Sequence, residues 1–158
     1  MVEAAKTEQE PVVGRAVRLL GGSETFKISP RTRLEAHKVI LSGFPGKALV
    51  RLSENVAIIR KPDDFEKALG MSLRTFQRRK KDASERKLSQ EQSGRVWKFA
   101  EVLGTAIEVF GSQQEAELFL ERPAVGLDQN RPIDLLATPA GVELVEAHLG
   151  RLKYGVYI

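Results

Sequence analysis

The chain contains no cysteine and no long hydrophobic run, and both absences narrow what it can be. Without cysteine it has neither a disulfide framework nor a thiolate metal site, which fits a reducing compartment. No run of about eighteen apolar residues is present, so we expect no membrane-spanning helix. The first residues, MVEAAKTEQEP, are acidic and polar, unlike a secretory signal. We therefore expect a soluble, cytoplasmic protein.

Groups suited to catalysis are also scarce. Histidine is the usual acid–base group near neutral pH, and the chain has only His37 and His148, which do not have the spacing of a zinc-binding pair. His37 lies among apolar neighbours, so we expect a partly buried structural residue. The stretch GRAVRLLGG lacks the spacing and the Lys-Ser/Thr ending of a phosphate-binding loop. We predict that the chain is not an enzyme and that it binds no cofactor or metal.

Positive charge, in contrast, is concentrated in the middle of the chain. The 158 residues include 25 Lys or Arg and 21 Asp or Glu, which gives a net charge of +4. Residues 1–59 carry +3, residues 60–100 carry +6 and residues 101–158 carry −5. A basic middle and an acidic end predict two surfaces with different partners. Chance clustering of solvated charge is the alternative.

Apolar residues recur at helical spacing along most of the chain, so we predict an all-α fold. The Ser-Pro pair at residues 29–30 is typical of a cap and a first helical turn. The helix that this pair would open runs through Leu34, His37 and Leu41 and ends at Gly43. A further helix is predicted over residues 45–55.

Two short helices joined by a tight turn are predicted next. The first spans residues 63–70 and breaks at Gly70, and the second begins after a cap at Ser72. The order helix, glycine turn, helix is that of a helix-turn-helix motif. The apolar residues that point inward from the two helices are Phe65, Ala68, Leu69, Leu73 and Phe76.

Three helices are predicted in the acidic part of the chain. The first opens at a capping box formed by Ser89 and Gln92 and ends at Gly111. The second opens at Ser112, and the third opens at Thr138. The apolar stripes of the first and the third are Val96, Ala100, Leu103, Ile107 and Phe110, and Val142, Val145, Leu149 and Leu152.

The segment SLRTFQRRKK, residues 72–81, carries five positive charges in ten residues. On a helical wheel of 100° per residue, one polar ridge consists of Arg74, Gln77, Arg78 and Lys81. Arg pairs with guanine and Gln with adenine in the major groove, while further cations such as Arg79 neutralise phosphate. The segment therefore predicts a DNA recognition helix. A solvated basic face is the alternative; a membrane-surface or calmodulin-target helix is less favoured, because the apolar side is only two residues wide.

The motifs TFQRR, RPIDLL, TPAG and LGRLKYGVY resemble those of the Xre/MbcA/ParS antitoxins, and the resemblance covers the chain from about Arg33 to its end. These proteins join an Xre-like helix-turn-helix to a C-terminal toxin-binding domain. The resemblance implies a partner toxin with a RES domain, an enzyme that destroys NAD, and it implies that the C-terminal domain blocks the toxin's active site. It also implies that the helix-turn-helix represses the operon encoding both proteins.

By position, the resemblance implies operator contacts at Arg74, Thr75, Gln77, Arg78 and Arg79, to which the helical wheel adds Lys81. It implies toxin contacts at Arg131, Pro132, Leu135, Leu136, Arg151, Lys153, Tyr154, Gly155, Val156 and Tyr157. One departure concerns the loop before the RPIDLL motif. The family often has Gly-Gly there, whereas this chain has Asp128 and Gln129, which leaves the shape of the loop open.

The tail favours an interface on physical grounds as well. Tyr154, Val156 and Tyr157 are bulky, whereas free chain ends are usually small and polar. Aromatic residues with a polar tip are good interface anchors. The alternative is that these side chains pack on the chain's own core. The acidic C-terminal half also suits a basic partner, because an active site that uses a nucleotide must neutralise phosphate.

We therefore predict an antitoxin with an N-terminal extension over residues 1–29 (partly flexible), a DNA-binding domain over residues 30–88 and a toxin-binding domain over residues 89–158. Its predicted partners are a RES-domain toxin, operator DNA and a second copy of the chain, because one recognition helix reads only a short half-site. The rival interpretation is a standalone helix-turn-helix regulator whose C-terminal domain senses a small ligand or a protein.

Overall fold

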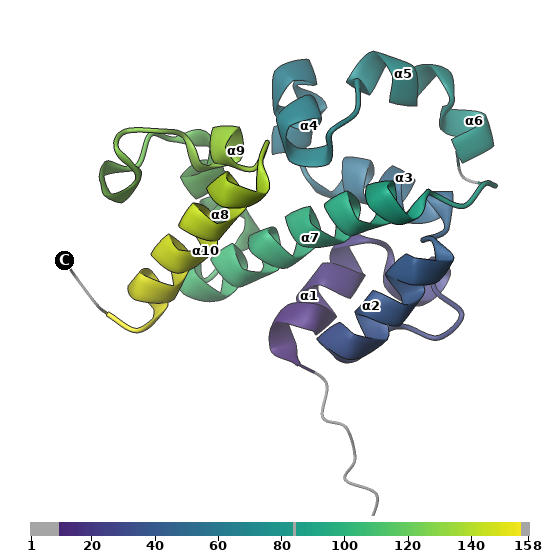
Figure 1. Ribbon diagram of the computed structural model, residues 1–158, viewed down its shortest axis with the longest axis horizontal. Coiled ribbons are helices and arrows are strands. Elements are labelled where there is room, and N and C mark those ends of the chain that lie inside the picture. Colours follow the sequence, from purple (N-terminus) through teal and green to yellow (C-terminus); the bar gives the residue numbers. More distant parts are fainter. Residues whose placement is uncertain (1–9, 84, 156–158) are drawn as a thin grey trace, which may run out of the picture.

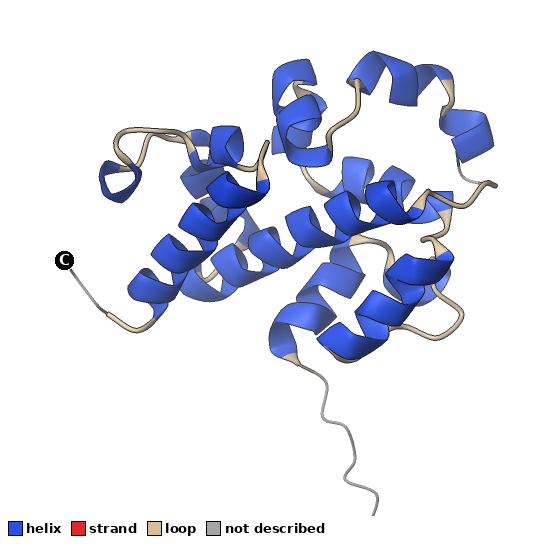
Figure 2. Cartoon of the chain, viewed as in Figure 1, coloured by secondary structure: helices blue, strands red, loops and turns tan. Residues whose placement is uncertain are grey.

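The computed structural model describes residues 10–83 and 85–155. Within these ranges every regular element is a helix (Figure 2), which confirms the predicted all-α fold. Strand-like pairing in these ranges is limited to two isolated bridges. None of the helices in these ranges is long and apolar enough to cross a membrane. The α-helices are α1 (Pro11–Leu19), α2 (Arg33–Ser42), α3 (Gly46–Asn55), α4 (Pro62–Leu69), α5 (Leu73–Arg78), α6 (Lys80–Ala83), α7 (Gln90–Phe110), α8 (Gln113–Glu121), α9 (Pro132–Leu135) and α10 (Pro139–Lys153); the 3₁₀ turns are η1 (Gly22–Glu24), η2 (Ile58–Arg60) and η3 (Val125–Leu127).

Helix α7 lies at the centre of the fold, and most of the longer helices pack against it. Its 21 residues run through the middle of the molecule and contact α1, α2, α4, α8 and α10 (Figure 1). The predicted capping box is present, since Ser89 Oγ accepts from the Gln92 backbone at 3.1 Å and Gln92 Oε1 accepts from the Ser89 backbone at 3.3 Å. Gly111 ends the helix with a φ of 87°. The predicted long helix is therefore confirmed.

One hydrophobic core continues along α7 from end to end. Near its start, the buried ring of Phe44 lies edge-on to Phe26 and to Trp97, with ring centroids 5.4 and 6.3 Å apart. Near its other end, Val145 and Leu149 of α10 belong to the same core. Because helices from both parts of the chain share this core, α7 holds the two parts together. The division between residues 88 and 89 stays a prediction.

Helix α2 begins later than its sequence predicts. Its cap is Thr32, whose Oγ1 accepts from the Glu35 backbone at 3.2 Å, so the predicted start at residues 29–30 is wrong. The backbone of Thr32 is extended, with φ −129° and ψ 163°, as a cap requires. The residue that caps a helix is the one directly before the first helical residue. Here the first helical residue is Arg33, so Thr32 is the cap and the Ser-Pro pair at residues 29–30 is not.

The buried face of α2 also differs from the prediction. Leu34, His37 and Leu41 are exposed, so the expectation of a partly buried His37 is wrong. The helix instead turns Ala36 and its apolar neighbour Ile40 toward the core. Apolar residues occupy more than one side of α2, and its packing on α7 decides which side is buried. Periodicity within α2 alone carries no such information.

Candidate functional site

Helices α4 and α5 form the predicted pair with a tight turn between them. Gly70 ends α4 in the left-handed conformation, and Ser72 Oγ accepts a long hydrogen bond, 3.4 Å, from the Thr75 backbone at the start of α5. The rings of Phe65 and Phe76 stack with their centroids 5.4 Å apart, which fixes the angle between the two helices. The helix-turn-helix geometry expected from these residues is confirmed.

Helix α5 is shorter than the predicted recognition helix. It ends at Arg78, because Arg79 has left the helical conformation (φ −101°, ψ 7°), and the chain then forms the separate helix α6. The predicted ridge that continued to Lys81 on one helix is therefore wrong. Phe76 is the last buried residue of α5, so no buried apolar side chain of this helix lies beyond it to extend the packing.

The polar side chains of α5 and α6 nevertheless share one exposed, cationic region, which we call the basic helix pair. Gln77, Arg78, Lys80 and Lys81 line a hollow of about 560 Å³ together with Val50 of α3. Thr75 is only half-buried, and Arg74 and Arg79 are exposed. Figure 1 shows α5 and α6 at the edge of the molecule, away from α10. Contact of these residues with DNA stays a prediction.

Arg131, expected at the toxin interface, is an internal ion-pair partner in the structure. Its Nη2 donates to Oδ1 of Asp64, a residue of α4 that is only 2% exposed. Asp134 adds a second link to α4, since Lys67 Nζ donates to its Oδ1 at 2.6 Å. Burial opposes the charge of the guanidinium, but the hydrogen bond and attraction to Asp64 outweigh it and raise the pKa of Arg131. The start of the RPIDLL motif is thereby fixed to the helix that supports α5.

The other residues of the RPIDLL motif mostly face the core. Pro132 and Leu136 are buried and Leu135 is half-buried, so the motif shapes the turn between α9 and α10 rather than offering side chains freely. In the TPAG motif, Thr138 Oγ1 accepts from the Gly141 backbone at 3.0 Å and caps α10. A Cβ on Gly141 would lie 1.8 Å from the carbonyl oxygen of Leu135, so only glycine permits this close approach.

The loop that departs from the family's Gly-Gly pattern has a glycine-like backbone. Asp128 and Gln129 have φ values of 53° and 63°, and they are the only residues other than glycine with positive φ in residues 10–83 and 85–155. The Asn130 backbone donates to the Leu127 carbonyl at 3.0 Å, which closes a tight turn around the pair. The shape of the loop is therefore one that two glycines would adopt without strain.

Replacing Gln129 with glycine is expected to stabilise the protein by about 0.5–1 kcal/mol, because a left-handed backbone is strained for glutamine and free for glycine. Urea unfolding would measure the change. Gln114→Gly, in the exposed surface of helix α8, provides the matched control and should destabilise the protein by a similar amount. A destabilising Gln129→Gly would show that the turn carries no strain.

The end of α10 exposes the first part of the predicted toxin contact. Tyr154 is 76% exposed, and Lys153 lies over its ring while Nζ pairs with Glu108 at 3.2 Å. Arg151 is half-buried, and Gly155 turns the chain with a φ of 67°. Val156 and Tyr157, the other predicted anchors, lie outside the described residues. Contact of these residues with a toxin stays a prediction.

Two exposed apolar residues of this half were not expected from the sequence. Val125 of η3 is 81% exposed and Leu144 of α10 is 54% exposed. Leu144 lies outside the predicted apolar stripe of α10. Its exposure could therefore have been predicted from its position in the sequence. His148 of α10 stacks on Phe119 of α8 with ring centroids 5.9 Å apart. Burial and the positive charge of Arg151 lower the pKa of His148. A neutral imidazole that packs on Phe119 is therefore favoured.

Comparisons with known proteins match these two parts of the chain separately. The model of the antitoxin Xre-like helix-turn-helix domain matches residues 35–101, which include α4 and α5. The model of the antitoxin Xre/MbcA/ParS C-terminal toxin-binding domain matches residues 105–155, which include α9 and α10. Among the 158 residues, these two matches leave out only the N-terminal part, a short piece of α7 and the last three residues.

A curated relative supports the same assignment. The protein named Antitoxin Xre from Yersinia enterocolitica serotype O:8 / biotype 1B is 30% identical to this chain over 92 residues, or 58% of the chain. The match spans 61% of the relative's own length. With its helix-turn-helix and its toxin-binding domain in this order, the chain belongs to the Xre-type antitoxin family.

Proposed function

We propose that the chain is the antitoxin of a type II toxin–antitoxin system, that it neutralises a RES-domain, NAD-degrading toxin, and that it represses its own operon. The observation that carries the proposal is the presence, in one chain, of an exposed basic helix pair and a separate toxin-binding domain. The chain itself would be no enzyme and would need no cofactor. Its two parts would act in the cytoplasm on two partners, operator DNA and the toxin.

The operator would be bound by the basic helix pair. Arg74, Gln77 and Arg78 of α5 are exposed and can reach base edges, while Arg79 and Lys81 lie beyond the end of α5, where they can contact phosphate. The break at Arg79 supports this division, because it turns the later cations away from the axis of α5. A dimer would present two recognition helices to two half-sites and multiply the affinity.

The toxin would be bound by the end of α10 and the residues after it. Tyr154 has an exposed aromatic ring with a polar tip. Its neighbours in sequence that are also expected to contact the toxin are Arg151, Lys153 and Gly155. Val125 and Leu144 add exposed apolar area to the same domain. Pro132 and Leu136 are buried before the start of α10, at the opposite end of this helix from Tyr154, and would act by shaping the turn between α9 and α10. The net charge of −5 over residues 101–158 suits a basic rim around a nucleotide-binding active site.

Replacing Arg78 with alanine is expected to weaken operator binding by about 1–3 kcal/mol if Arg78 reads a base, and to leave toxin neutralisation intact. Fluorescence anisotropy with the DNA upstream of the operon, at one fixed salt concentration, would measure the affinity. Growth rescue of bacteria that express the RES-type toxin encoded beside the gene would measure neutralisation.

The matched control is Arg60→Ala, because Arg60 is an exposed arginine of η2 that lies before α4 rather than on the basic helix pair. It should leave the operator affinity within about twofold of the wild type, as expected for a surface substitution away from the contact. Equal losses of operator binding and neutralisation in Arg78→Ala would indicate misfolding and would contradict the proposed separation of the two surfaces.

A further inference from the structure

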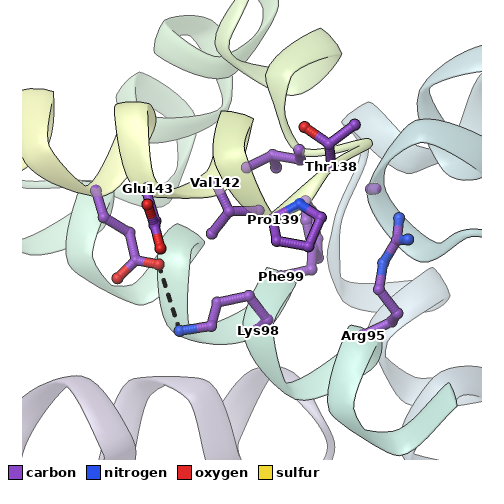
Figure 3. A pocket seen from close by; sticks show the side chains of 10 residues that line it. Arg95, Lys98, Phe99, Thr138, Pro139, Val142 and Glu143 are labelled. Carbon is purple, nitrogen blue, oxygen red and sulfur yellow. Dashed lines mark ion pairs between the residues drawn. The ribbon is translucent and has the colours of Figure 1, made fainter. Parts of the chain in front are cut away.

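A hollow of about 350 Å³ lies where the DNA-binding and toxin-binding parts meet, between α4, α7 and α10 (Figure 3). Its apolar floor includes Phe99 and Val142, with Ala68 of α4 and Leu136 at its sides. The volume is that of a site for a small ligand. The residues assigned above to DNA do not line this hollow, and of those assigned to the toxin only Leu136 does.

A fixed cation stands at one end of the hollow. Arg95 Nη2 donates to the Lys67 carbonyl at the end of α4, at 3.0 Å. Its Nη1 lies 3.0 Å from the place where a Cβ on Gly70 would stand, so the absence of a side chain there gives the guanidinium its room. Within residues 10–83 and 85–155, Arg95 pairs with no carboxylate. A positioned guanidinium with donors to spare is suited to a carboxylate.

The opposite charge stands at the other end. Figure 3 shows Arg95 on the side of Thr138 and Pro139, and Glu143 on the far side, with Phe99 and Val142 between them. Glu143 forms no ion pair with any described residue, whereas Glu146 shares Lys98 with Glu101, at 3.3 and 2.9 Å from Nζ. The positive end of the α10 dipole adds to Arg95. The hollow is therefore cationic at the start of α10 and anionic further along the helix.

The spacing of the charges sets the length of a ligand. Glu143 and Glu146 follow Pro139, on whose side Figure 3 shows Arg95, by four and seven residues. At 1.5 Å per residue they stand about 6 and 10.5 Å along the helix axis from that end of the hollow. An extended chain spans at most about 3.3–3.6 Å per residue. A compound with a carboxylate and an ammonium group two to three residues apart would therefore meet both ends, while its apolar side chains would cover the floor.

We propose that this hollow binds a short free peptide, a dipeptide or a tripeptide with apolar side chains, whose carboxylate meets Arg95 and whose amino group meets Glu143. Both free ends are needed, so an internal segment of a folded protein does not satisfy the site. The proposal is independent of the antitoxin function, since it concerns only residues of the hollow. A bound peptide would contact α4, α7 and α10 at once.

Calorimetric titration of the full chain with Leu-Leu tests the proposal. We expect saturable binding at millimolar peptide, at least about tenfold weaker binding for N-acetyl-Leu-Leu and for Leu-Leu amide, and weaker binding for free leucine. These comparisons use the unaltered protein, so they do not depend on how a variant folds. Equal binding of all four compounds, or no binding of Leu-Leu, would overturn the proposal.

Two substitutions test which residue binds each end of the peptide. Arg95→Ala should weaken Leu-Leu binding about tenfold. Glu143→Gln removes an exposed charge that forms no ion pair with a described residue, and it should weaken binding about threefold. Arg122→Ala and Glu115→Gln remove exposed charges at the two ends of α8, a helix that does not line the hollow, and should leave the affinity unchanged. Glu143→Gln should not change the affinity for N-acetyl-Leu-Leu, which has no ammonium group, and if it bound Leu-Leu as the wild type does, the assigned orientation would be wrong.

Discussion

Replacing Arg131 with methionine is expected to lower the free energy of unfolding by about 3–5 kcal/mol, because the carboxylate of Asp64 would remain buried without a cation. Asp64 is 2% exposed, and its Oδ2 already has no hydrogen-bond partner among the described residues. Among residues 10–83 and 85–155, Arg131 is the only cation that forms an ion pair with the carboxylate of Asp64. Since domains are stabilised by only about 5–15 kcal/mol, the loss is large. Urea unfolding followed by the fluorescence of Trp97 would measure it.

Two further variants separate the buried pair from ordinary surface charge. Asp64→Asn combined with Arg131→Met removes both charges and should recover part of the stability, because no buried ion is left unpaired. Lys61→Met breaks the exposed pair of Lys61 with Glu121, which also links α4 to the toxin-binding part, and should change the urea midpoint little. An Arg131→Met variant as stable as Lys61→Met would show that the pair does not hold α4 and α9 together, and a toxin contact for Arg131 would regain support.

Features encoded by neighbouring residues could be predicted from the sequence. The capping box of Ser89 and Gln92, the cap at Ser72 and the glycine that ends α4 all formed where their residues indicated. Each depends on a hydroxyl or a glycine within three or four residues of the backbone group that it serves. The apolar stripe of α7 was equally clear, because 21 residues give several turns of consistent spacing.

Features set by distant residues could not be predicted in this way. The side of α2 that is buried depends on α7, and Arg131 is internal because Asp64 lies 67 residues earlier in the chain. Asp64 itself reads as a helix-dipole residue at the start of α4, and only the fold shows its ion pair. The break after Arg78 has the same origin, since the helical wheel assumes that packing continues beyond Phe76.

The candidate sites also differ in whether neighbouring or distant residues form them. The cationic segment was evident from its charge and from its place after a glycine turn, although its division into α5 and α6 was not. The tail was evident from its aromatic residues. The hollow with Arg95 and Glu143 was not, because its walls come from three helices and its charges lie 48 residues apart. A constellation of this kind has no sequence spacing by which it could be found.

Ending the chain at Leu152 is expected to abolish neutralisation of a RES-type toxin in the growth assay, while the full chain restores growth. The truncation removes exposed Tyr154 and the residues after it, together with Lys153, whose pair with Glu108 lies at the surface. The core residues of α10, Val145 and Leu149, stay in place, so we expect the shortened chain to fold. Soluble levels of both forms would be checked by blot.

A point substitution refines the same experiment. Tyr154→Ala should reduce rescue by the loss of one interface anchor, by about 2 kcal/mol or more in affinity if the ring is a hot spot. Ile28→Ala removes an apolar side chain that is even more exposed, 88%, but that lies before α2 in the predicted N-terminal extension, and it should rescue as the full chain does. Rescue by the truncated chain would return the tail to a packing role. Failure of the full chain as well would favour a helix-turn-helix regulator without a RES partner, because the basic helix pair would then be the one surface left with a function.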